Sequence, residues 1–222
     1  MLLNPITTLL SHASAVCAAL VLCAAPAVAD ERWRALEAGD GEAAGYALYV
    51  EETDEAYPGY KAECQLDVDP EEAAVSTMVL MTGRDFVPDG QTRRILRRGE
   101  DELILHTHID MPMMVTDREL TIRLTHSSDP ETGIHRIDWV NADEEAPASN
   151  GRVIQISDAR GHWEFVPDGS GRTRATYVTH ADLGGWLPAG LISPLMRGQV
   201  AGDVTRLQQA VRKFTVSAAP ED

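Results

Sequence analysis

The sequence has 222 residues, of which 35 are Asp or Glu and 19 are Lys or Arg, so its formal net charge is −16. An acidic surface repels phosphate backbones and anionic headgroups. Nucleic acid is therefore a poor partner and we expect none, and strong electrostatic binding to anionic membranes is disfavoured.

The first 29 residues contain no charged side chain and carry an apolar run, Ala13 to Ala25, followed by Ala27-Val28-Ala29. This small-x-small ending is the pattern that signal peptidase cleaves. We therefore expect residues 1–29 to be a signal peptide, residues 30–222 to form one domain, and the protein to be periplasmic or secreted. The second interpretation, an uncleaved membrane anchor, needs a span of about 20 residues, and the apolar run is shorter than that.

Only one of the three cysteines, Cys64, lies beyond residue 29. The mature chain can therefore form no intrachain disulfide, and its fold must be held together by a hydrophobic core.

The N-terminal part of the expected domain begins with a helical pattern. Residues 31–38 place Trp33 and Leu36 on one side, which predicts a short helix. Alternating segments at 46–51 and 61–68 then predict two strands.

A second helix has a clear start. Asp69 can cap it, Pro70 suits the first helical position, and Glu72 lies three residues after the cap. We expect the helix to run from Pro70 to Gly83. The residues at helical spacing in it are Val75, Met78, Val79 and Thr82.

From Thr92 onward the sequence predicts an antiparallel meander, because apolar and polar residues alternate and the links have the composition of hairpin turns. One face of the resulting sheet is apolar and must be covered. The expected strands are 92–98, 102–110, 119–126, 134–141, 153–157, 161–167 and 172–182.

The C-terminal segment from Leu187 to Phe214 supplies the cover. Its apolar residues recur at steps of three and four, which predicts an amphipathic helix about 40 Å long that lies along the sheet in an α+β fold. Pro194, Gly198 and Gly202 interrupt it. They indicate either a mobile lid or a static kink with glycines that allow close packing.

Two passages resemble those of the START family, the steroidogenic-acute-regulatory-protein-related lipid-transfer domains. Met111 to Leu120 is similar to the family's P-x-x-x-x-x-R-D-[FY] passage, in which an omega loop crosses a cavity mouth, although Glu119 stands where Asp is usual. His180 to Pro188 is similar to the D-x-x-G-W-[LI]-P junction between the last strand and the long helix. The order of elements agrees from about Gly45 to Phe214.

The resemblance implies a helix-grip fold, in which a curved antiparallel sheet grips a long C-terminal helix and encloses a cavity. It further implies that the cavity binds a lipid, a sterol or another hydrophobic molecule for transport or sensing, with transient membrane contact at a gate made by the omega loop and the helix. We expect a monomer with no cofactor. The predicted ligand-binding residues are Met113, Met114, Val115, Arg118, Trp139, Trp186, Leu187, Leu191, Ile192, Leu195 and Met196.

Two other functions remain open. The helix-grip superfamily includes polyketide cyclases, so a small-molecule enzyme is the first alternative, and a protein-interaction module with a filled cavity is the second. No nucleophile elbow or phosphate loop occurs, and no catalytic or metal-binding residue is predicted. His106 and His108 share one strand face and could hold a metal only with a third ligand. The candidates for that ligand are His126, His135, His162 and His180.

Overall fold

The computed structural model of the chain describes residues 31–36, 45–55, 57–83, 87–100, 102–112, 115–149, 151–187 and 189–218. The expected signal peptide at residues 1–29 lies outside the described residues, so it stays a prediction.

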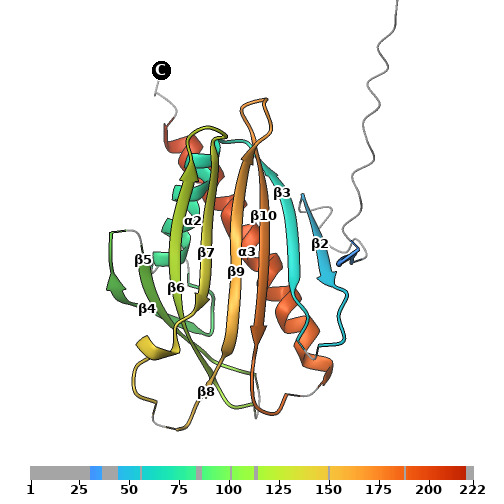
Figure 1. The fold of residues 1–222 in the computed structure, drawn as a ribbon, viewed down its shortest axis with the longest axis vertical. Helices are drawn as coiled ribbons and strands as arrows, with labels where there is room; N and C mark the ends of the chain where they lie inside the picture. Colours follow the sequence, from blue (N-terminus) through green and yellow to red (C-terminus); the bar gives the residue numbers. More distant parts are fainter. Residues whose placement is uncertain are drawn as a thin grey trace, which may run out of the picture. The chain divides into compact units, whose positions relative to one another are not determined.

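A single ten-stranded sheet forms the framework of the domain (Figure 1). Its strand order is β1-β2-β3-β10-β9-β7-β6-β5-β4 with antiparallel neighbours, and β8 pairs in parallel with β6. The strands are β1 (Trp33–Ala35), β2 (Tyr46–Glu51), β3 (Tyr60–Leu66), β4 (Gln91–Arg98), β5 (Glu102–Ile109), β6 (Arg118–Asp129), β7 (Ile134–Asn141), β8 (Ile154–Gln155), β9 (Ser157–Pro167) and β10 (Thr173–Asp182).

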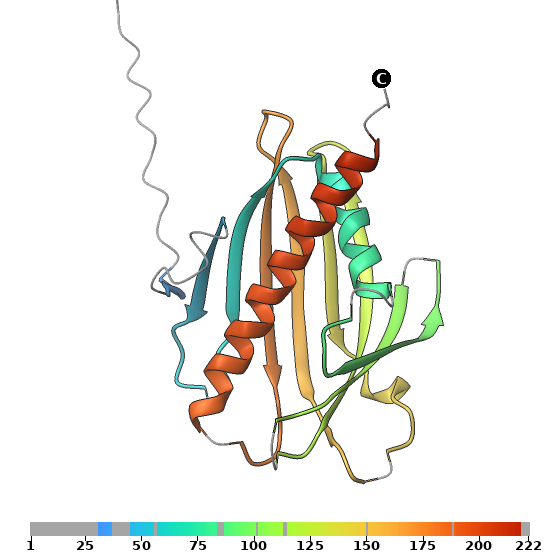
Figure 2. The same cartoon turned by 180° about the vertical axis from the view of Figure 1, so that it is seen from behind.

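Two α-helices, α2 (Pro70–Thr82) and α3 (Ala189–Ala218), cover one face of this sheet. Figure 2 shows α3 crossing the curved sheet diagonally from the β2–β3 side towards α2. The only other helical segment among the described residues is a 3-10 turn, η2 (Asp143–Glu145). None of the described helices combines the length and the apolar character that crossing a membrane requires. The antiparallel sheet with the long C-terminal helix across one face confirms the predicted α+β helix-grip fold.

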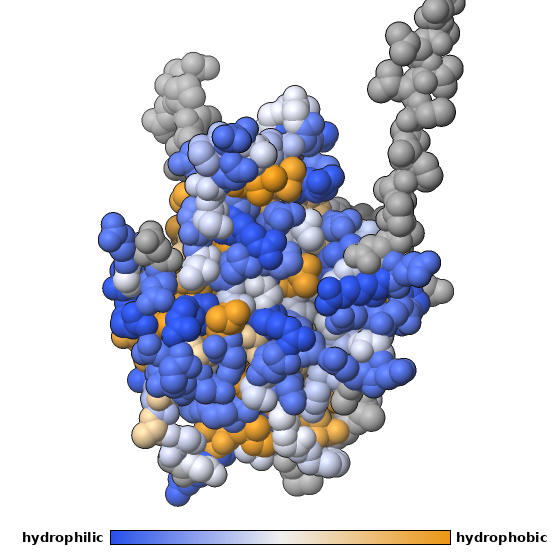
Figure 3. Space-filling model, viewed as in Figure 1, coloured by the Kyte–Doolittle hydropathy of each residue, from blue (hydrophilic) through white to orange (hydrophobic). Residues whose placement is uncertain are grey.

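The opposite face of the sheet is hydrophilic over most of its area (Figure 3). Ion pairs join neighbouring strands there: Arg136 on β7 contacts Glu164 on β9 at 3.2 Å, and Arg123 on β6 contacts Glu102 on β5 at 3.3 Å. Period-two alternation thus places polar side chains in water and apolar side chains under the helices, as the sequence predicted.

Two segment predictions were wrong. Trp33 to Ala35 form strand β1, which pairs with β2 in the register Trp33 to Glu51, where we expected a helix. A helix this short is only marginally stable by itself, so pairing with a sheet edge decides the outcome. The expected strand 153–157 is divided between β8, which pairs with β6, and the start of β9.

Helix α2 begins as predicted, since the Asp69 side chain accepts a hydrogen bond from the Glu72 amide at 2.8 Å. Its buried face, however, consists of small residues, while Val75 is 57% exposed and Val79 is 36% exposed. Small side chains let the helix lie close to the sheet, and this contact decides which face is buried. The buried residues are Ala73, Ala74, Ser76 and Thr77.

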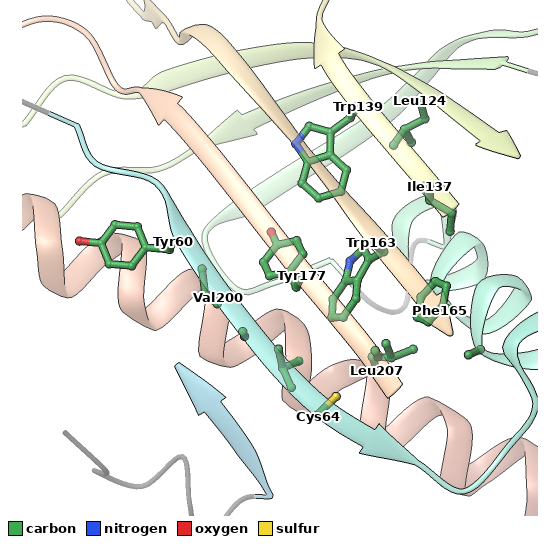
Figure 4. Close-up of a cluster of buried hydrophobic side chains, with 14 of the residues drawn as sticks. Tyr60, Cys64, Leu124, Ile137, Trp139, Trp163, Phe165, Tyr177, Val200 and Leu207 are labelled. Carbon is green, nitrogen blue, oxygen red and sulfur yellow. The ribbon is translucent and has the colours of Figure 1, made fainter. Parts of the chain in front are cut away.

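Aromatic side chains on β7, β9 and β10 form the centre of the core (Figure 4). Trp163 stacks on Tyr177 with ring centroids 4.5 Å apart and on Phe165 at 5.8 Å. Gly161 on β9 is required beside them, because a Cβ atom there would lie 2.4 Å from the Trp139 ring. Cys64 is buried in this core, and burial raises the pKa of its thiol to about 12.

Candidate ligand-binding cavity

A cavity of about 240 Å³ lies between the concave face of the sheet and helices α2 and α3. Its wall is mainly apolar and draws on both helices and on strands β4, β5, β6, β7, β9 and β10. The apolar lining residues are Leu80, Met81, Leu105, Ile109, Met111, Leu120, Ile122, Trp139, Ile156, Trp163, Ala181, Leu183, Leu195, Met196 and Leu207.

Alternation along β5 decides which of its side chains reach the cavity. Leu105, Thr107 and Ile109 line it, whereas His106 and His108 are absent from the lining and lie on the opposite face of the strand. The two histidines that we considered as possible metal ligands therefore do not face the cavity.

The predicted ligand-binding residues are only partly brought together. Four line the cavity: Arg118, Trp139, Leu195 and Met196. Five described residues lie outside the lining: Val115, Trp186, Leu187, Leu191 and Ile192. Two lie outside the described residues: Met113 and Met114.

Trp186 is 76% exposed, so it is neither a core residue nor a wall of the cavity. It follows two glycines with left-handed backbone, Gly184 at φ 62° and Gly185 at φ 60°. L side chains are strained at these φ values, and a Cβ atom on Gly185 would also lie 2.4 Å from the Cδ1 end of Ile154, so glycine is favoured at this turn.

A group of polar side chains that the sequence did not single out occupies one part of the wall. The Asp203 carboxylate on α3 accepts hydrogen bonds from the Tyr177 hydroxyl at 2.9 Å, from Gln199 at 2.9 Å and from Arg206 at 2.6 Å. Gln91 on β4 donates in turn to Gln199 at 3.2 Å, which links the edge strand to the helix. Burial, and next the charge of Asp203, raise the pKa of Tyr177 well above its usual value.

The sequence did contain a signal for this group. Gln199, Asp203 and Arg206 recur at steps of four and three on α3, so they share a helix face with the buried Met196 and Leu207. Polar residues inside an apolar stripe indicate a partner across the interface. Which partner they meet depends on how α3 packs on β10 and β4, which periodicity does not reveal.

Arg93 on β4 also lines the cavity, next to the C-terminal end of α2. One of its terminal nitrogens donates to the carbonyl oxygens of Leu80 at 3.3 Å and Met81 at 2.9 Å. The last carbonyls of a helix have no partner within the helix, so the guanidinium supplies one and offsets their partial negative charge. Burial lowers the pKa of Arg93, and the charge of Asp203 opposes this effect. An arginine guanidinium stays protonated in proteins.

Arg118, at the start of β6, is 1% exposed. Its guanidinium donates to three backbone carbonyls, those of Leu183 at 3.2 Å, Gly184 at 2.9 Å and Thr116. We predicted Arg118 as a ligand-binding residue, and it does line the cavity. The observed role is a tie between the loop before β6 and the chain that leads from β10 into α3.

On the outer face, His106 is buried and its Nδ1 lies 3.0 Å from the Thr121 hydroxyl. His108 lies 3.3 Å from a carboxylate oxygen of Asp110 and 3.6 Å from one of Asp117. Potential ligand atoms of these last three residues all lie within 4.8 Å of one another. The groups beside His108 are thus carboxylates, where the sequence suggested another histidine as the third ligand: His126, His135, His162 or His180.

No family model and no curated protein matches this sequence. The fold does match solved structures. The crystal structure of a STAR-related lipid transfer protein from Xanthomonas axonopodis has a TM-score of 0.69 at 20% identity, covering 82% of this chain and 99% of that chain. Human StAR-related lipid transfer protein 5 has a TM-score of 0.65 at 14% identity, covering 83% and 88%. The chain therefore has the helix-grip fold of the START domains, as the two sequence passages predicted.

Proposed function

We propose that the protein binds a lipid or another hydrophobic small molecule in the cavity beneath α3 and carries or senses it. The observation that carries this proposal is the cavity itself. Fifteen of the 25 described lining residues are apolar, and the cavity lies inside a domain whose fold leaves room under one helix. Each buried CH₂ group of a ligand contributes about 0.8 kcal/mol, so such a space selects apolar ligands.

Two similar structures support this function, because both bear the name of a lipid transfer protein. The unfilled space argues against an interaction module, since a module needs no cavity. No observation favours the cyclase-like alternative. The described part of the lining holds no histidine, and its one carboxylate, Asp203, already accepts three hydrogen bonds.

For ligand exchange we propose movement of the loop 110–117 together with the first turns of α3. Met111 of this loop and Leu195 of the helix both line the cavity, so their displacement would open it. Pro194 lies inside α3 and removes one helical hydrogen bond, which weakens this end of the helix.

The test is native mass spectrometry of the full chain, expressed with residues 1–29 in a Gram-negative host and recovered from the periplasm. We expect a near one-to-one adduct whose mass, after solvent extraction, is that of a lipid or another apolar molecule. The same spectrum should show Asp30 as the first residue, as proposed for an exported protein. A mass without adduct, unchanged after incubation with fatty acids, sterols and phospholipids, would contradict the binding function.

A further inference from the structure

Charge is distributed unevenly between the surface and the cavity. The chain has a net charge of −16, yet the charged side chains in the described lining are three arginines and one aspartate. Asp203 is compensated by Arg206, whose nitrogen lies 2.6 Å from its oxygen. Arg118 has an acceptor for each of three nitrogens. Neither Arg93 nor Arg118 has a described carboxylate within 4.0 Å, but only Arg93 leaves guanidinium nitrogens without an acceptor among the described residues, and the charge of Asp203 acts on it from farther away.

The guanidinium of Arg93 is incompletely used. Only one of its terminal nitrogens has acceptors among the described residues, namely the Leu80 and Met81 carbonyls, and no described carboxylate lies within 4.0 Å. Arg93 is partly buried. Removing a cation from water is costly unless it is paired, and a planar guanidinium matches a carboxylate or phosphate with two parallel hydrogen bonds. An anionic group arriving in the cavity would supply this missing partner.

From this arrangement, and resting on the proposed function, we propose that the cavity binds a single-chain amphiphile whose anionic headgroup, a carboxylate or a phosphate monoester, docks on Arg93. The volume of about 240 Å³ is below the range of about 300–1,000 Å³ that is typical of drug-sized ligands, which favours one chain over two. Apolar walls hold the chain, and Gln91 and Tyr177 lie in the same lining as further polar contacts.

The test uses the full chain and the neutral fluorescent probe N-phenyl-1-naphthylamine, displaced by ligands that share one chain. Myristate and myristoyl lysophosphatidate are expected to displace the probe at concentrations roughly tenfold or more below that of myristyl alcohol, since a charge-assisted pair separates them. Myristyl trimethylammonium should be the weakest. The ratio between the first two ligands distinguishes a carboxylate from a phosphate headgroup.

Arg93→Gln can still donate to the α2 carbonyls but carries no charge, so it should remove the preference for anions while probe binding remains. Arg93→Lys should retain part of the preference. Arg94→Gln is the matched control, because Arg94 is the exposed next residue of β4 and lies outside the cavity lining.

The outcomes separate this inference from the proposed function. If the probe does not bind and no ligand is retained, the binding function fails. If the probe binds but acid and alcohol displace it equally, or if Arg93→Gln retains the preference, the headgroup assignment is overturned while the binding function stands. The comparison of ligands on the unsubstituted protein decides this even if a variant does not fold.

Discussion

Arg118 shows how one buried side chain can hold two loops together. It bridges the carbonyls of Thr116, Leu183 and Gly184, and no shorter or uncharged side chain offers three donors in this geometry. We expect Arg118→Met to lower the free energy of unfolding by about 2–4 kcal/mol, because buried acceptors are left without donors. Urea denaturation measures this loss.

Arg123 on the same strand is the matched control. It makes partly exposed ion pairs with Glu102 and Glu144, which typically contribute under about 1 kcal/mol. Equal losses for Arg118→Met and Arg123→Met would show that the three carbonyl contacts do not hold the loops.

His106 predicts a pH dependence of stability. Burial lowers the pKa of His106, with the charge of Glu119 opposing this effect. Its unfolded pKa is about 6.5, so below that pH the unfolded chain binds more protons than the folded chain. Stability should therefore fall as the pH drops below about 6.5. Burial also lowers the pKa of His162, which acts in the same direction.

Denaturation at about pH 7.5 and about pH 5.5 brackets this window. His106→Gln should reduce the difference in unfolding free energy between the two. Asp129→Asn should not, because hydrogen bonds, above all from Thr132, lower the pKa of the Asp129 carboxyl and place its effect at more acidic pH. An unchanged difference in His106→Gln would rule out His106 as the source.

At the scale of elements, α3 contains a glycine that packing does not explain. A Cβ atom on Gly198 would meet nothing within 4 Å, so the expectation that this glycine allows close packing is wrong. Gly198→Ala should stabilise the protein by about 1 kcal/mol, the difference in helix propensity. If the glycine serves a mobile lid, amide hydrogen exchange in residues 191–202 should also be slower in Gly198→Ala than in the unsubstituted protein.

Gly202→Ala is the comparison on the same helix. Its Cβ atom would lie 3.0 Å from one terminal nitrogen of Arg206, whose other terminal nitrogen pairs with Asp203. The gain in stability from Gly202→Ala should therefore be smaller. Uniform strong protection of residues 191–202 in the unsubstituted protein would contradict the mobile lid, and destabilisation by Gly198→Ala would contradict the absence of contact.

The strands could be predicted from the sequence because each carries its own alternation, as Leu103 and Leu105 do in β5. The buried face of α2 could not, since close contact with the sheet selected Ala73 and Ala74 over Val75. The polar group around Asp203 could not either. It joins side chains from α3, β10 and β4, and only the packed molecule brings them together.

At the scale of the whole molecule, an acidic exterior surrounds a cavity whose charged lining is mainly arginine. The negative potential of the exterior and the positive potential of the cavity act on different steps of ligand binding. The exterior repels an anionic ligand or membrane at long range and weakens as salt screens it, within about 10 Å at 0.1 M salt. The arginines act only after the ligand has entered, where water no longer screens them.

Strand β10 pairs with β3 on one side and β9 on the other, so Thr173 must find Leu66 far back along the chain. Contacts between such distant residues form slowly, because closing a long loop costs entropy before the pairing compensates for it. Helix α3 follows β10 in the chain and packs against β3 and β10, so its docking surface is complete only when these two strands have paired. We therefore expect the cavity to form late in folding, and a ligand already resting on the sheet would be enclosed when the helix docks.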